Sequence, residues 1–116
     1  MMQLITSDLN KIKSVAILGR LDTTTYPSLE ECLNQLFTTG TRQLVIDCSQ
    51  MDYVSSSGLR VFLMMLKKMK SENGTLVICG LQAPIHNVFE ISGFLSIFNI
   101  APDVEKALGF FDQTND

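Results

Sequence analysis

The sequence predicts an α/β fold in a single domain. From residue 14 to residue 100, short apolar stretches of strand length alternate with amphipathic stretches of helix length. This alternation is typical of a largely parallel or mixed sheet whose strands are joined by crossover helices. The length of 116 residues fits one domain, and no repeat, low-complexity tract or Pro/Gly-rich linker divides residues 1–116.

The individual elements are marked by apolar spacing and by residues that begin or end helices. Asp22 and the threonines after it offer a helix cap, Pro27 suits a first helical turn, and Gly40 suits a helix end. The predicted elements, in order, are strands over residues 4–9 and 14–19, a helix between Pro27 and Gly40, a strand over 43–47, a helix over 57–70, a strand over 75–80, a helix over 83–91, a strand over 97–100 and a helix over 102–110. Residues 113–116 are expected to fray.

Composition and charge exclude several classes of function. Hydrophobic residues make up 46% of the chain and charged residues 18%, which is ordinary for a globular domain. The net charge of -3 gives no general attraction to nucleic acid or anionic lipid, so nucleic-acid binding is not expected. No apolar run approaches the ~20 residues of a membrane span, and the first residues lack the features of a secretory signal. Three cysteines without a CxxC pair, Cys32, Cys48 and Cys79, are expected to be reduced and buried, which predicts a cytoplasmic protein.

Residues 44–60 are the most informative stretch of the chain. They read as a buried strand, a short polar turn, and then three serines and a glycine that open an apolar helix. Serines at the start of a helix act as caps, as nucleophiles or as phosphorylation targets. A nucleophile elbow requires Gly-x-Ser-x-Gly, and Ser55-Ser56-Ser57-Gly58 lacks its first glycine. The only histidine, His86, is expected on the surface of a helix, so no base is assigned and a hydrolase is not expected.

No cofactor or metal site is predicted either. Gly58 stands without the glycine spacing that cradles phosphates in nucleotide-binding proteins. The carboxylates of Glu30, Glu31, Asp47 and Asp52 have no histidine or cysteine cluster to complete a metal site. We therefore interpret them as turn, cap and solvated helix residues.

Phosphorylation is the remaining chemical role for the serines. A hydroxyl at a helix start is accessible, and a phosphate there adds about -1.5 to -2 charges at neutral pH. Arg60, one turn after Ser56, is placed to pair with such a phosphate. The alternative is that Ser55 or Ser56 only caps the helix, a contribution of typically about 1 kcal/mol. The residues alone leave both interpretations open.

The same helix predicts a surface beside the serines. Its core face is expected to contain Leu59, Phe62, Leu63, Leu66 and Met69. Two apolar residues, Val61 and Met64, point well away from that face and share the outer side with Arg60, Lys67 and Lys68. Either they form an exposed docking surface, or another part of the chain, such as the C-terminal helix, covers them.

Residues 47–60, Asp-Cys-Ser-Gln-Met-Asp-Tyr-Val-Ser-Ser-Ser-Gly-Leu-Arg, closely resemble the signature of STAS domains, the bacterial anti-sigma factor antagonists. Gly19-Arg20-Leu21-Asp22 is similar to the family's Gly-x-Leu-Asp, and Ser92-Gly93-Phe94 to its later turn. The resemblance covers nearly the whole chain. It implies a single STAS-like α/β domain with a four- or five-stranded mixed sheet flanked by helices, and a non-enzymatic role in transcription regulation.

The resemblance also implies partner switching. In that scheme the unphosphorylated antagonist binds an anti-sigma factor with serine kinase activity and frees the sigma factor. The kinase phosphorylates the first serine of the Ser-Ser-Gly motif, which is Ser56 here, and a metal-dependent serine phosphatase reverses this. Many members carry aspartate directly before that serine, whereas this chain has Ser55. This third adjacent hydroxyl makes the modified position ambiguous, with Ser56 the favoured target and Ser55 or Ser57 the less favoured ones.

We expect the partner-binding residues to lie around the start of this helix. They are Asp22, Thr23, Ser55, Ser57, Gly58, Arg60, Val61 and Met64. A homodimer could use the same surface. The alternative function is a STAS scaffold that is not phosphorylated, or a subunit of a larger regulatory or transport complex, in which Ser56 only caps its helix.

Overall fold

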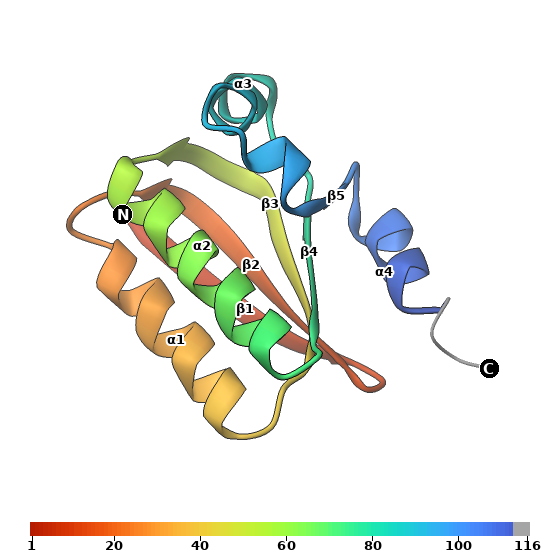
Figure 1. Ribbon diagram of the computed structural model, residues 1–116. Coiled ribbons are helices and arrows are strands. Elements are labelled where there is room, and N and C mark those ends of the chain that lie inside the picture. Colours follow the sequence, from red (N-terminus) through yellow and green to blue (C-terminus); the bar gives the residue numbers. More distant parts are fainter. Residues whose placement is uncertain (113–116) are drawn as a thin grey trace.

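The protein folds into one twisted sheet with helices packed on both faces (Figure 1), and a computed structural model describes residues 1–112. The sheet contains β1 (Met2–Leu9), β2 (Ile12–Leu21), β3 (Gln43–Val54), β4 (Thr75–Cys79) and β5 (Asn99–Ala101). Its strands lie side by side in chain order. Only β1 and β2 are antiparallel, and the later neighbours are parallel. The predicted mixed α/β sheet is confirmed, with five strands; the predicted fraying concerns residues 113–116, outside the described part.

The helices are α1 (Tyr26–Thr38), α2 (Ser56–Ser71), α3 (Ala83–Ile91) and α4 (Val104–Asp112), with a short 3-10 turn, η1, over Phe94–Ser96. Figure 1 shows α1 and α2 side by side on one face of the sheet and α4 on the opposite face, while α3 lies at one end. Each parallel pair of strands is connected through at least one helix, as parallel pairing requires. This arrangement places the start of α2 at the end of the sheet where β2 and β3 finish.

Successive residues of β3 enter two different cores. Leu44 and Ile46 belong to the larger cluster, which α1 and α2 cover. Val45 belongs to a smaller cluster with Ala107 and Phe111 of α4. A strand covered on both faces needs apolar side chains on both faces, which explains the unbroken apolar run that predicted it.

The predicted end of the strand that begins at Gln43 is wrong. The sequence suggested a polar turn soon after residue 47, but β3 continues to Val54 and pairs with β2 along its length. Cys48, Met51 and Val54 remain in the core while the residues between them are mostly exposed. Two register shifts in the β2–β3 pairing break the strict alternation of buried and exposed positions, so the pattern no longer resembles a strand.

Candidate functional site at the start of α2

Ser55 caps α2. Its backbone is extended, and its hydroxyl oxygen accepts a hydrogen bond from the Gly58 N–H at 3.2 Å. The Ser55 N–H donates to the carbonyl oxygen of Leu21 at 2.9 Å, and its carbonyl oxygen accepts from the Leu59 N–H at 3.0 Å. Ser55 therefore fixes the start of the helix against the end of β2. Of the two serines proposed as caps, the structure selects Ser55.

Ser56 occupies the first helical position and is exposed. Within the described part of the chain, its hydroxyl forms no hydrogen bond. Ser57 is half-buried, whereas Arg60 is exposed one turn further along and forms no ion pair with any residue described. The structural role is thus taken by Ser55, and Ser56 is left accessible for chemistry.

Gly58 allows α2 to approach the sheet closely. A Cβ at this position would lie 2.7 Å from Leu21 Cγ and 3.1 Å from Val54 Cγ2. Leu21 is fully buried, so it has little freedom to move aside. The glycine of the serine motif is therefore required by packing between α2, β2 and β3.

We expect Gly58→Ala to lower the free energy of unfolding by about 1–3 kcal/mol, because overpacking outweighs the gain in helix propensity. Urea denaturation followed by circular dichroism measures this change. Gly109→Ala is the matched control, since Gly109 also lies within a helix and its added Cβ would meet nothing within 4 Å. The control should gain about 0.5–1 kcal/mol. Equal effects of the two substitutions would contradict the packing argument.

The loop between β2 and α1 lies beside the start of α2, because the Ser55 N–H is hydrogen-bonded to the carbonyl oxygen of Leu21 at the end of β2. Asp22 organises this loop: its carboxylate accepts from the Thr24 hydroxyl at 2.7 Å and from the Thr24 N–H at 2.9 Å. These hydrogen bonds, with further ones from Thr25 and a contact with Arg20, lower the pKa of Asp22 to about 2. Asp22 is therefore ionised at neutral pH. It orders the loop rather than capping α1, whose cap position is occupied by Thr25.

Thr23 is exposed at the tip of the same loop. The structure thus brings Asp22 and Thr23 to the same end of the sheet as the serines, although more than 30 residues of sequence separate the two segments. A partner that covers the start of α2 would also meet this loop.

The prediction that Val61 lies outside the core is wrong. Val61 is only 3% exposed and belongs to the same core cluster as Leu29 and Leu33 of α1. Helix α1, rather than the C-terminal helix, covers this side of α2 (Figure 1). Met64 is half-buried and still lies on the outer side.

The core face of α2 is correspondingly displaced from the one that the sequence predicted. Its buried residues are Gly58, Val61, Phe62, Met65, Leu66 and Met69. Leu59 and Leu63, which were expected in the core, are half-buried and pack against its edge. Packing against both the sheet and α1 explains why the buried arc is turned toward α1.

Four of the predicted partner-binding residues line one hollow between α1 and α2. Its volume is about 290 Å³, and its lining residues are Ser57, Arg60, Val61 and Met64 from α2, with Tyr26 and Glu30 from α1. The sequence analysis missed the contribution of Tyr26 and Glu30. A signal existed, because Tyr26 follows directly after the Asp22–Thr25 loop, but pairing it with Ser57 required the packing of the two helices.

Arg20 and Tyr53 add a second feature that the sequence analysis did not include in the site. They are paired across β2 and β3, and the Arg20 guanidinium lies 4.1 Å from the centre of the Tyr53 ring. Arg20 also contacts the Asp22 carboxylate at 3.5 Å. The result is an exposed cation–π pair beside the Asp22 loop, of the residue types that are enriched in protein interfaces.

The three cysteines are free thiols, and two of them are buried. Burial raises the pKa of Cys79 to about 12 and raises that of Cys48 well above its ordinary value. Cys32 is half-buried, so the prediction of buried thiols is confirmed for Cys48 and Cys79 only. No cluster of His, Cys, Asp or Glu within residues 1–112 is suited to hold a metal ion, and no helix described is long and apolar enough to span a membrane.

The fold and the serine motif define a class of protein, and comparison with known families identifies it. The STAS domain model matches residues 5–107, so the chain belongs to the STAS domain family of anti-sigma factor antagonists. It is 31% identical to the anti-sigma-B factor antagonist of Staphylococcus aureus over 86% of this chain and 93% of that protein. Anti-sigma factor antagonists are non-enzymatic regulators of transcription.

A second relative shares a shorter region at higher identity. BtrV of Bordetella bronchiseptica, which is assigned as an anti-sigma factor antagonist, is 47% identical over 72 residues, and this match spans 62% of each chain. The two relatives therefore support the same family through matches of different extent.

Solved structures share the fold. An anti-sigma factor antagonist from Mycobacterium paratuberculosis superposes with a TM-score of 0.87 at 22% identity, covering 94% of this chain and 92% of the other. The phosphorylated form of SpoIIAA, a cell fate determinant of Bacillus, gives a TM-score of 0.74 at 16% identity and covers 96% of this chain and 99% of its own.

Proposed function

We propose that this chain is an anti-sigma factor antagonist that acts by partner switching. Its unphosphorylated form binds an anti-sigma factor with serine kinase activity, and this binding releases the sigma factor. Phosphorylation of Ser56 ends the binding, and a metal-dependent serine phosphatase restores it. The observation that carries this proposal is the exposed Ser56 hydroxyl, which forms no hydrogen bond in the described structure while its neighbour Ser55 caps the helix.

The surroundings of Ser56 support a role as a switch. Ser56, the loop that contains Asp22 and the hollow beside Ser57 lie at the same end of the molecule. One partner could therefore contact all three at once. A phosphate on Ser56 adds about -1.5 to -2 charges at the edge of that surface. The Arg60 side chain, one turn along the helix, forms no ion pair with the described residues and can pair with the phosphate in the unbound state. On partner binding, the phosphate would be desolvated or would meet the partner's carboxylates, and both oppose association.

The names of the relatives support the identity of the partner. The Staphylococcus aureus relative is an antagonist of an anti-sigma factor, and SpoIIAA has been solved in a phosphorylated form. Carried to this chain as a proposal, the first name supports an anti-sigma factor as the partner, and the second supports phosphorylation as the modification. The resemblance of residues 47–60 to the STAS signature supports a serine of the 55–57 cluster as the target. Accessibility favours Ser56 within that cluster.

Mass spectrometry after incubation with ATP and the kinase that co-purifies with the chain tests the proposal. We expect one phosphate on Ser56, and Ser56→Ala should abolish it. Ser55→Ala is the matched control: it removes a neighbouring hydroxyl, so it should lower stability by about 1 kcal/mol but keep the phosphate on Ser56. A phosphate on Ser55 or Ser57 would reassign the target. No phosphate on any serine would favour a scaffold that is not modified.

A further inference from the structure

A second hollow continues the first along α2. It has a volume of about 360 Å³ and is lined by Arg60, Leu63, Met64, Lys67 and Lys68. Arg60 and Met64 line both hollows, so the two adjoin along α2. We call the two adjoining hollows, from Ser57 to Lys68, the α2 groove. The twelve helical residues from Ser57 to Lys68 span a rise of about 16 Å, which matches about three turns of a bound helix.

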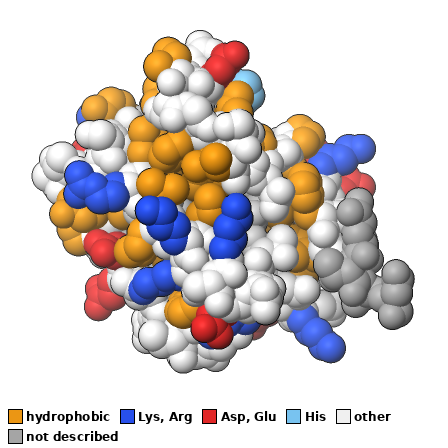
Figure 2. All heavy atoms as spheres, viewed as in Figure 1, with side chains coloured by type: hydrophobic (Ala, Val, Ile, Leu, Met, Phe, Trp, Pro, Cys, Tyr) orange, Lys and Arg blue, Asp and Glu red, His pale blue; other side chains and the backbone are white. Residues whose placement is uncertain are grey.

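The α2 groove combines apolar and basic side chains, with one carboxylate, that of Glu30, at its Ser57 end. Leu63 and Met64 are half-buried apolar residues at its centre, and methionine adapts its shape to a partner. Arg60, Lys67 and Lys68 surround them. Figure 2 shows hydrophobic side chains gathered over this part of the molecule with Lys and Arg side chains beside them.

The net charge of α2 is opposite in sign to that of the whole chain. The chain carries a net charge of -3, yet the α2 sequence contains four basic residues and no acidic one. Lys68 is directed toward α1, since its ammonium donates to Asn34 Oδ1 at 2.5 Å. Arg60 and Lys67 form no ion pair within residues 1–112. These two cations remain available to carboxylates of another molecule.

We propose that the α2 groove binds an acidic amphipathic helix of a protein partner. The apolar side of that helix would contact Leu63 and Met64, and its flanking carboxylates would pair with Arg60 and Lys67, as in other helix-in-groove complexes. This inference rests on the proposed function only in taking the partner to be a protein. It adds a specific ligand chemistry and an electrostatic link to the switch, because a phosphate on Ser56 would compete for Arg60.

A peptide pair tests the charge requirement with the full chain. The probe is a fluorescein-labelled amphipathic peptide of about 14 residues with leucines on one face and glutamates on its flanks. The matched peptide carries lysine in place of every glutamate. Fluorescence anisotropy should show the acidic peptide binding at least about tenfold more tightly than the basic one. Equal affinities, or no binding of the acidic peptide at millimolar concentration, would overturn the proposal.

Two charge reversals locate the binding site. Lys67→Glu should weaken binding of the acidic peptide about tenfold, because an attraction becomes a repulsion. Lys106→Glu makes the same charge change at an exposed position on α4 and should leave the affinity unchanged. An equal loss in both variants would indicate general charge attraction and contradict a specific groove.

Methyl NMR provides an independent readout. The ε-methyl signal of Met64 should shift on peptide addition, whereas that of Met69, which is fully buried, should not. Shifts confined to other methionines would place the peptide elsewhere and overturn the assignment. If the chain is phosphorylated on Ser56 but fails these peptide tests, the proposed binding in the α2 groove is wrong and partner switching stands. If the acidic peptide binds in the groove but no serine is phosphorylated, partner switching is contradicted and the binding proposal stands.

Discussion

Ser56→Asp is expected to weaken binding of the anti-sigma factor more than a hundredfold, a loss of about 3 kcal/mol, whereas Ser56→Ala should bind about as well as the unmodified chain. The carboxylate places a permanent charge at the exposed start of α2, where the partner must exclude water. Alanine adds no charge and leaves the helix cap in place, since Ser55 supplies it. Isothermal titration calorimetry with the anti-sigma factor recovered from the host measures both affinities.

A charge control separates a local effect from a general one. Ser7 is exposed on β1, near the hairpin at the far end of the sheet from Ser56. Ser7→Asp changes the net charge by the same amount as Ser56→Asp and should leave the affinity unchanged. If Ser56→Asp and Ser56→Ala bound equally well, the electrostatic account of the switch would be wrong, even if Ser56 were phosphorylated in the cell.

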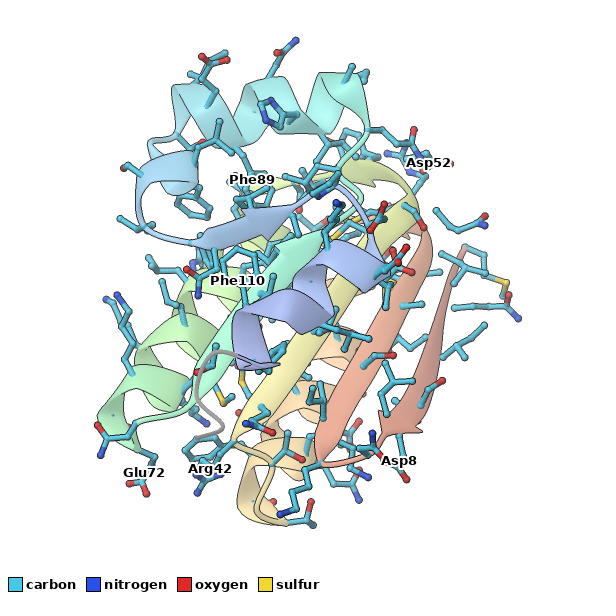
Figure 3. All side chains as sticks on the ribbon, turned by 90° about the vertical axis from the view of Figure 1, so that its right-hand side faces the viewer. Asp8, Arg42, Asp52, Glu72, Phe89 and Phe110 are labelled. Atoms are coloured by element: carbon cyan, nitrogen blue, oxygen red, sulfur yellow. The ribbon has the colours of Figure 1, made fainter. Side chains whose placement is uncertain are left out.

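Phe89→Ala is expected to cause the largest loss of stability, about 3–5 kcal/mol. Phe89 is fully buried between α3 and the sheet (Figure 3). Its ring centre lies 5.6 Å from that of Phe94, 5.8 Å from that of Phe62 and 6.2 Å from that of Phe98. Truncation removes the central ring of this cluster and leaves a cavity. A domain is stabilised by only about 5–15 kcal/mol, so the variant should approach the limit of folding at 37 °C.

Urea denaturation of Phe89→Ala and Ile91→Ala tests this expectation. Ile91 lies two residues later in the same helix but is 87% exposed, so its truncation should change the free energy of unfolding by no more than about 0.5 kcal/mol. Both variants replace a large apolar side chain of α3 with alanine, which keeps helix propensity effects similar. A comparable loss in the two variants would mean that the aromatic cluster does not hold α3 on the sheet.

Local signals in the sequence were enough to predict several elements. The range 83–91 for α3 is reproduced, because Pro84 marks its start and Ser92-Gly93 its end. The end of α1 near Gly40 is reproduced as well, since this glycine adopts a positive φ of 107°. In each case the determining residues lie within the element or directly beside it.

Features that depend on distant residues could not be predicted in the same way. The burial of Val61 follows from the packing of α1 beside α2, which the periodicity of α2 does not contain. The length of β3 was missed because register shifts against β2 interrupt the alternation that identifies a strand. Ser56 was selected by resemblance before the structure assigned the cap to Ser55, and the hollow shared with Tyr26 emerged only from the helix pair.

The capping of α2 by Ser55 has a consequence for repeated signalling. A modification that removed a helix cap would destabilise the fold each time it was applied, and the chain would lose part of its population to unfolding in every cycle. Here the anchoring hydroxyl and the accessible hydroxyl belong to adjacent residues. If Ser56 is the residue that is modified, phosphorylation changes the charge at the start of α2 without removing the helix cap. Many rounds of phosphorylation and dephosphorylation would then leave the folded structure unchanged.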